Sequence, residues 1–233
     1  PNLRHLGHRV DDVELVLFTG DSSHVGTAAE LAFCRKALAP LIEAAPHFIC
    51  MPGNHDVYLS REPYRRQFGD LAMRGEPLGE EGGWPRCYTF GDVDVVVLDS
   101  AKPNPHFYST GCVSEDQLYP LRAYLQGVSG KRVLIATHFG LLGEDGNLDR
   151  RSHGIVNASA YRDVLEYAPE GSICLHGHTH HLFRADPPGL PTMLCAGSTT
   201  FAGREGIWLL DVSAATFTAS PGRWDGEAYR LTP

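Results

Sequence analysis

The chain has 233 residues, a formal net charge of −8 with neutral histidines, 42% apolar residues and 21% charged residues. This composition is typical of a globular protein, and no apolar run is long enough for a transmembrane helix. The acidic balance argues against a dedicated nucleic-acid-binding protein, because neutralising phosphates requires a basic face.

Apolar runs bounded by Gly, Pro and Asp predict the β-strands of the chain. In its main part they span residues 15–18, 47–51, 86–90, 93–98, 133–136 and 172–175. Gly91-Asp92 separates the third run from the fourth and predicts a hairpin. In the tail, we expect the successive strands of a second sheet at residues 192–196, 207–212 and 215–219.

Helices are predicted from capping patterns that precede apolar residues at helical spacing. Thr27–Glu30 and Ser114–Gln117 have the spacing of capping boxes. Pro40 should break the first helix or end it early, and Pro120 should kink the second or delay its start.

A short helix is expected near residues 64–68, and Asn157 should cap a helix over residues 158–167. Residues 139–156 are rich in Gly, Asn and charge, which predicts a long loop. Because strands and helices alternate, the fold class is expected to be α/β and layered. Residues 1–233 contain no repeat or linker, so we expect one domain.

The six cysteines are scattered and include no Cys-x-x-Cys pair. This pattern predicts reduced thiols and a cytoplasmic location.

Polar segments directly follow four of the predicted strands. They are Thr19-Gly20-Asp21, Gly53-Asn54-His55-Asp56, Thr137-His138 and Gly177-His178-Thr179-His180. Ligands of open α/β sheets gather at the carboxyl ends of the strands. We therefore expect one carboxylate, one amide and several imidazoles to meet at one rim, a set of donors that suits Mn, Fe or Zn.

Each segment alone has a simpler interpretation. Asp21 would be a turn carboxylate, Gly53-Asn54 a turn dipeptide and His138 an interior histidine with satisfied hydrogen bonds. His178 and His180 would form a surface cluster. The metal site is favoured because every member follows a predicted strand.

The order Gly-Asp, Gly-Asn-His-Asp, isolated His and Gly-His-x-His resembles that of calcineurin-like metallophosphoesterases, from the first strand to about Val212. The resemblance implies a four-layer α/β/β/α sandwich of two mixed β-sheets flanked by helices. It also implies two divalent metal ions (Mn, Fe, Zn or similar) as cofactors. The implied reaction is hydrolysis of a phosphoester by a metal-activated hydroxide, without a covalent phosphoenzyme.

The same resemblance implies the metal ligands. Asp21 would bridge the two metals. Asn54, His138 and His178 would complete the second metal site, and His180 would bind the first metal.

His55 is implied as the catalytic residue that protonates the leaving oxygen or donates to the phosphoryl group, and Asp56 is predicted as catalytic beside it. Many family members have an Asp three residues after the Gly-Asp carboxylate, where it orients the catalytic His. This chain has His24 there, which we expect to line the pocket. The other candidates for substrate binding are Asn104 and Arg184, for which a turn residue and a surface arginine are the alternatives.

The chain departs from the family pattern because no Asp-x-His precedes the first predicted strand. His5 and His8 lie upstream in a polar segment without strand character and are not expected to be ligands. We expect the natural protein to carry the Asp-x-His strand before Pro1, the alternative being a site with one metal or none. His153 is expected to be a solvated loop residue.

The motifs Gly-Asn-His-Asp and Gly-His-Thr-His on one compact domain are similar to those of class III cyclic-nucleotide phosphodiesterases. The favoured function is therefore hydrolysis of a small phosphodiester, with a phosphatase also open, and with no nucleic-acid or membrane partner. The alternative is a catalytically degenerate scaffold for protein interaction, similar to the retromer subunit of this fold. A DNA-repair nuclease is disfavoured by the acidic balance.

Overall fold

The computed structural model describes residues 13–79, 83–105 and 107–232. The strands are β1 (Leu15–Phe18), β2 (His47–Cys50), β3 (Glu76–Pro77), β4 (Arg86–Phe90), β5 (Val93–Val97), β6 (Arg132–Ala136), β7 (Ile173–His176), β8 (Phe183–Ala185), β9 (Thr192–Cys195), β10 (Gly206–Val212), β11 (Phe217–Trp224) and β12 (Tyr229–Leu231). The helices are α2 (Ala28–Ala44), η1 (His55–Val57), which is a 3-10 turn, α3 (Glu62–Ala72), α4 (Glu115–Gly127) and α5 (Ala158–Leu165).

The described strands form three sheets. The largest has the order β3-β4-β5-β6-β7-β9-β8, in which β5, β6, β7 and β9 run parallel to one another, while β3, β4 and β8 pair antiparallel at the two edges. β1 and β2 form a parallel pair, and β10, β11 and β12 form an antiparallel sheet. The predicted hairpin is confirmed, because β4 pairs with β5 across a turn in which Gly91 has a φ of 59°.

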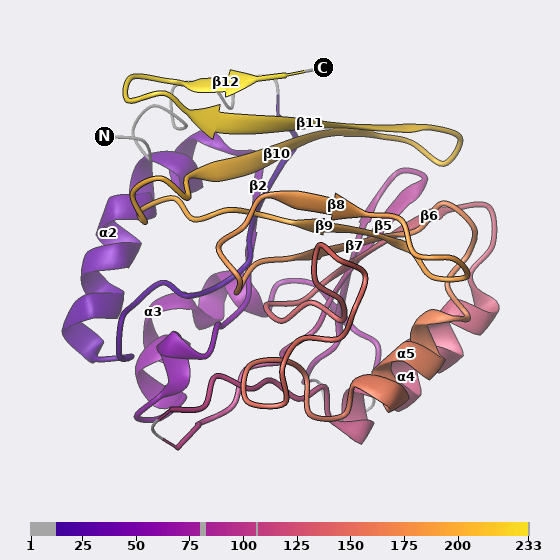
Figure 1. Cartoon of the computed structure of the whole chain (residues 1–233), viewed down its shortest axis with the longest axis horizontal. Helices are drawn as coiled ribbons and strands as arrows, with labels where there is room; N and C mark the ends of the chain where they lie inside the picture. The colour runs from indigo at the N-terminus through magenta and orange to yellow at the C-terminus, as the bar shows by residue number, and fades with distance from the viewer. Residues whose placement is uncertain (1–12, 80–82, 106, 233) are drawn as a thin grey trace.

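These elements stack in four layers (Figure 1). Helices α4 and α5 pack on one face of the seven-stranded sheet. The other face packs against β1, β2, β10 and β11, and helices α2 and α3 cover β1 and β2 from outside. The predicted α/β/β/α sandwich is confirmed, although the second β-layer consists of two sheets among the described residues.

The central strands explain the layer order. Val95 and Val97 of β5 face the second β-layer, whereas Val96 between them faces α4 and α5. Successive side chains of a strand point to opposite faces, and every residue of β5 and β6 is buried. Burial on both faces is the usual environment of a parallel sheet covered by two layers.

One strand lies in a different sheet from the predicted one. The run at 192–196 was expected to begin the second sheet, but β9 pairs parallel with β7 in the large sheet. The reason is that Met193 packs under the α4–α5 layer while Leu194 packs against the second β-layer. A strand that is apolar on both faces fits the covered interior of the large sheet.

The helix caps are only partly as predicted. The Thr27–Glu30 capping box is present. Ser114 makes no capping bond to a backbone N–H, and its Oγ instead accepts from Nε2 of Gln117 at 3.3 Å. The Gln117 side chain also pairs with both backbone groups of Asp99, at 2.9 and 2.8 Å. Asn157 likewise makes no capping bond and instead pairs with the backbone of Val113.

The two prolines lie within continuous helices, so the break or early end expected at Pro40 and the later start expected at Pro120 are wrong. Pro40 lies inside α2 and Pro120 inside α4. A proline costs the helix one hydrogen bond, but buried leucines flank each proline and hold the helix against the core: Leu38, Leu41, Leu118 and Leu121.

Within the described part of the chain, no helix has both the length and the apolar character needed to cross a membrane. All six cysteines are free, as predicted.

Candidate metal centre

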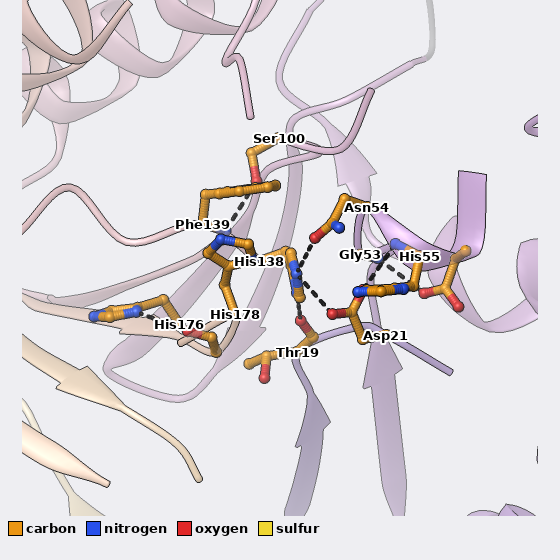
Figure 2. Close-up of polar contacts among 12 residues, drawn as sticks. Thr19, Asp21, Gly53, Asn54, His55, Ser100, His138, Phe139, His176 and His178 are labelled. Atoms are coloured by element: carbon orange, nitrogen blue, oxygen red, sulfur yellow. Dashed lines mark hydrogen bonds and ion pairs between the residues drawn. The ribbon is translucent and has the colours of Figure 1, made fainter. Parts of the chain in front are cut away.

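Four strand ends meet at the junction of the two β-layers. Strands β1, β2, β6 and β7 are followed by residues whose side chains lie together in Figure 2: Asp21, Asn54, His138 and His178. The edge of the β-layers at which these side chains lie opens into a cavity of about 1910 Å³. Among the residues that line this cavity are Asp21, His24, His55, His138, His178 and His180.

His138 connects the two halves of this edge. Its Nδ1 donates to the carbonyl oxygen of Thr19 at 2.7 Å, so Nε2 is the nitrogen left for other partners. Nε2 lies 3.3 Å from Oδ2 of Asp21 and 3.1 Å from Oδ1 of Asn54. A carboxylate oxygen, an amide oxygen and an imidazole nitrogen therefore converge on one point (Figure 2).

Gly53 makes the position of Asp21 possible. A Cβ on Gly53 would lie 2.1 Å from Oδ1 of Asp21 and 2.4 Å from its backbone nitrogen. Oδ1 instead accepts a hydrogen bond from the backbone N–H of His55 at 3.0 Å. Any side chain at position 53 would therefore displace the carboxylate.

Backbone strain is concentrated at the candidate ligands. The φ values of Asp21, His178 and His180 are 58°, 66° and 55°, and Phe107 is the other non-glycine residue with a positive φ in the described part of the chain. This conformation costs a residue with a Cβ roughly 1–2 kcal/mol. It persists only where surrounding contacts over-determine it, which is common at functional sites.

His178 completes a compact group. One ligand atom of His178 lies within 4.8 Å of a ligand atom of Asp21 and of His138, and the two imidazole centroids are 5.3 Å apart. Nε2 of His178 donates to the carbonyl oxygen of His153 at 2.9 Å. Nδ1 is therefore the His178 nitrogen with a free lone pair.

His180 lines the cavity but stands apart from this group. Within the described residues it belongs to no cluster of three ligand atoms as compact as that of Asp21, His138 and His178. Its ring lies 5.7 Å from that of Phe201. Burial lowers the pKa of His180, which favours the neutral imidazole that a metal requires.

His55 is oriented by a backbone group. Its Nδ1 donates to the carbonyl oxygen of His24 at 2.7 Å, and the two imidazole rings stack with centroids 5.8 Å apart. The His55 ring is thus held by a main-chain carbonyl and not by a carboxylate. His24 also lines the cavity, where it was expected.

Asp56 is fully buried and does not line the cavity. One of its carboxylate oxygens accepts from the backbone N–H of Gly53 at 2.9 Å and the other from Oγ of Ser23 at 3.1 Å. These bonds hold the turn that carries Asn54 and His55, so the carboxylate that was predicted as catalytic is bound within this turn and not turned toward the cavity.

The charges of the group are strongly coupled. Burial alone would raise the pKa of Asp21, but the charge and hydrogen bond of His138 hold the pKa of that carboxyl well below its usual value. Burial alone would lower the pKa of His138, but Asp21 raises it. Burial and the neighbouring His138 lower the pKa of His178 well below its usual value. At neutral pH the Asp21 carboxylate is therefore ionised and the His178 imidazole is neutral.

Two predicted substrate residues lie away from the cavity lining. Asn104 bonds within its own loop, where Oδ1 accepts from the Thr110 hydroxyl at 2.7 Å. Arg184 on β8 pairs with Asp186 at 2.8 Å. Both arrangements match the turn and surface alternatives. His5 and His8 lie outside the described residues.

Asp149 and His153 approach the centre although His153 was expected to be a solvated loop residue. Their ligand atoms and one of His178 lie within 4.8 Å of one another. Their spacing of four residues in a long loop was the only sign of this in the sequence.

The donor set fits a divalent transition metal. It combines a carboxylate oxygen, an amide oxygen and two imidazole nitrogens, a mixture that Mn, Fe and Zn accept. The Nε2 atom of His138 and the Nδ1 atom of His178 are both left available by bonds from the opposite ring nitrogen, an arrangement that commonly orients histidine ligands.

A comparison with protein families agrees with this chemistry. A family model described as calcineurin-like phosphoesterase matches residues 2–182. The structure is similar to that of a dimetal phosphatase from Danio rerio, with a TM-score of 0.68 and 16% sequence identity. That similarity covers 94% of this chain and 81% of the other. A search of curated proteins found no match.

Proposed function

This chain belongs to the family of calcineurin-like phosphoesterases, and we propose that it hydrolyses a small phosphodiester at a site that holds two divalent cations. Metal-dependent hydrolysis of phosphoesters follows from the family. The number of cations and the preference for a diester are our inferences.

The observation that supports the proposal most is the convergence at His138. Its Nε2 atom, Oδ2 of Asp21 and Oδ1 of Asn54 face one another across a junction of two β-layers. Buried polar groups are costly unless they bind a partner, and a cation would satisfy these three together with His178. Asp21 would be shared with a second cation bound by His180.

Side chains of this chain would hold the cations and donate a proton to the substrate. Bound cations supply positive charge to the phosphoryl oxygens and lower the pKa of water. Asp21, Asn54, His138 and His178 would hold one cation in place. His55, whose Nδ1 is held by the His24 carbonyl, keeps Nε2 available to donate to a phosphoryl oxygen or to protonate the departing alkoxide.

The same proposal covers substrate size and location. A net charge of −8 supports a small phosphoester as substrate over a nucleic acid. Six free cysteines support a reducing compartment, and we propose the cytoplasm.

The test is metal content by elemental analysis together with hydrolysis of bis-p-nitrophenyl phosphate in Mn²⁺, on the protein with its native N-terminus. Two equivalents of metal and Mn²⁺-dependent hydrolysis are expected. Hydrolysis of p-nitrophenyl phosphate alone would make the enzyme a phosphatase instead. Absence of both metal and hydrolysis would favour the alternative of a protein-interaction scaffold.

A further inference from the structure

The loop between β6 and α5 reaches the candidate metal centre. Nδ1 of His153 lies 2.6 Å from Oδ2 of Asp149, and the His153 carbonyl accepts from Nε2 of His178 at 2.9 Å. His178 is thus the member common to two groups, one with Asp21 and His138 and the other with Asp149 and His153.

We propose that Asp149 and His153 are positioning residues that set the orientation and tautomer of His178 and thereby the affinity of the cation site. This inference rests on the proposed function only in requiring that a cation binds beside Asp21. Its readout is cation binding and not hydrolysis.

The hydrogen bond to the His153 carbonyl decides the tautomer. A carbonyl oxygen only accepts, so Nε2 of His178 must carry the proton, and Nδ1 keeps the lone pair that a cation requires. Rotation of the ring by a half-turn about the Cβ–Cγ bond would put Cδ2 in the place of Nδ1 and Cε1 in the place of Nε2, so that carbon atoms faced both partners. Partners that hold the other nitrogen of a histidine ligand commonly prevent this.

Ring contacts restrict His178 further. The His153 ring lies 4.2 Å from the His178 ring and the Phe139 ring lies 4.0 Å from it, measured between centroids. His178 is 9% exposed and has a φ of 66°. A strained, buried ligand in contact with two rings has little freedom to change its position.

Asp149 fixes His153 in turn. The ion pair adds a side-chain constraint to the bonds that His153 and Gly154 donate to the carbonyl of Arg150, at 2.8 and 2.9 Å. The side chains of His153 and Asp149 are 42% and 26% exposed, so their pair contributes little to folding stability. Removing one of these side chains should therefore change the orientation of His178 more than the stability of the fold.

A direct ligand role for this pair is less favoured by the geometry. Nδ1 of His153 and Oδ2 of Asp149 are already used in their mutual hydrogen bond. A cation placed between them and His178 would also have to replace the bond to the His153 carbonyl.

The experiment is a titration of the metal-free full chain with Co²⁺, followed by visible absorption, and with Mn²⁺, followed by calorimetry. Asp149→Ala should raise Kd about 10–100-fold without changing the number of cations bound. Asp149→Asn, which keeps an acceptor oxygen, should recover most of the affinity. Asp145→Ala is the control, because Asp145 lies in the same loop and bonds to Asn147.

A double variant tests whether the effect passes through His178. On a His178→Ala background, Asp149→Ala should cause no further loss of affinity. The inference is overturned if Asp149→Ala leaves Kd unchanged, or if it weakens cation binding equally on the His178→Ala background. It is also overturned if Asp149→Ala removes a whole equivalent of bound cation, because Asp149 would then be a ligand itself. A wild-type chain that binds no cation overturns the proposed function as well.

Discussion

Nε2 of His138 lies 3.3 Å from Oδ2 of Asp21, and the two side chains come from opposite β-layers. The ion pair explains why the pKa of Asp21 is lowered and that of His138 is raised despite burial. It also places a proton on the atom that a metal would bind, so proton and cation compete for His138.

The first prediction concerns this competition. Because Asp21 raises the pKa of His138, the imidazole keeps its proton up to a higher pH, and a cation that binds His138 must displace that proton. Affinity for Mn²⁺ should therefore increase as pH rises and level off above the pKa of His138, with protons released on binding. Calorimetry in buffers of different ionisation enthalpy measures the release. A Kd that does not depend on pH would contradict a role of His138 as ligand.

The second prediction concerns the carboxylate. Asp21→Asn replaces the carboxylate of the proposed ligand set by a neutral amide. Binding of Mn²⁺ should weaken at least tenfold, because the cation loses an anionic ligand. Circular dichroism should show that the fold is kept. Asp116→Asn, on the first turn of α4, is the matched control and should bind Mn²⁺ normally.

The third prediction compares two glycines. A Cβ at Gly53 would collide with Asp21, whereas one at Gly69 inside α3 meets nothing within 4 Å. Gly53→Ala should abolish measurable cation binding. Gly69→Ala should bind normally and gain about 0.5–1 kcal/mol of stability, because alanine favours the helix interior. Chemical denaturation and Mn²⁺ titration of both variants check this pair, and normal binding by Gly53→Ala would refute the geometry at Asp21.

The fourth prediction distinguishes the role of the His55 side chain from that of the His24 backbone carbonyl. His55→Ala should lower kcat by about 10²–10⁴-fold while cation affinity is kept, because a proton donor is lost and no proposed ligand is. His24→Ala keeps the carbonyl that holds Nδ1 of His55, so its kcat should fall less than tenfold. Steady-state kinetics with bis-p-nitrophenyl phosphate compare them. Equal losses would mean that the His24 ring itself takes part.

The fifth prediction concerns pH and stability. Burial lowers the pKa of His176 to about 4 from a usual value of 6.5. Between these values only the unfolded chain binds the proton, so stability should fall as pH decreases from 6.5 to 4, by up to about 3 kcal/mol. Denaturation of metal-free protein across this range measures the slope. His176→Gln should show a flatter slope, and an unchanged slope would assign the effect elsewhere.

Sequence reasoning identified most strands because their apolar runs are distinctive, and it identified the polar residues at their ends. It placed β9 in the wrong sheet, since the run itself does not tell which neighbour covers each face. It also expected caps from Ser114 and Asn157, but the Ser114 hydroxyl accepts from the Gln117 side chain and the Asn157 side chain pairs with the backbone of Val113. Such choices depend on contacts between distant segments.

The amino-acid order by itself determined which donors are present and that each follows a strand, because strand periodicity and turn residues are local properties. Only the tertiary structure decided that Asp21, Asn54 and His138 face one point, and that backbone carbonyls of Thr19, His24 and His153 orient the imidazoles. Every residue has a carbonyl, so a sequence contains no sign of which one will accept a given hydrogen bond. That selection is made when the β-layers and the long loop pack together.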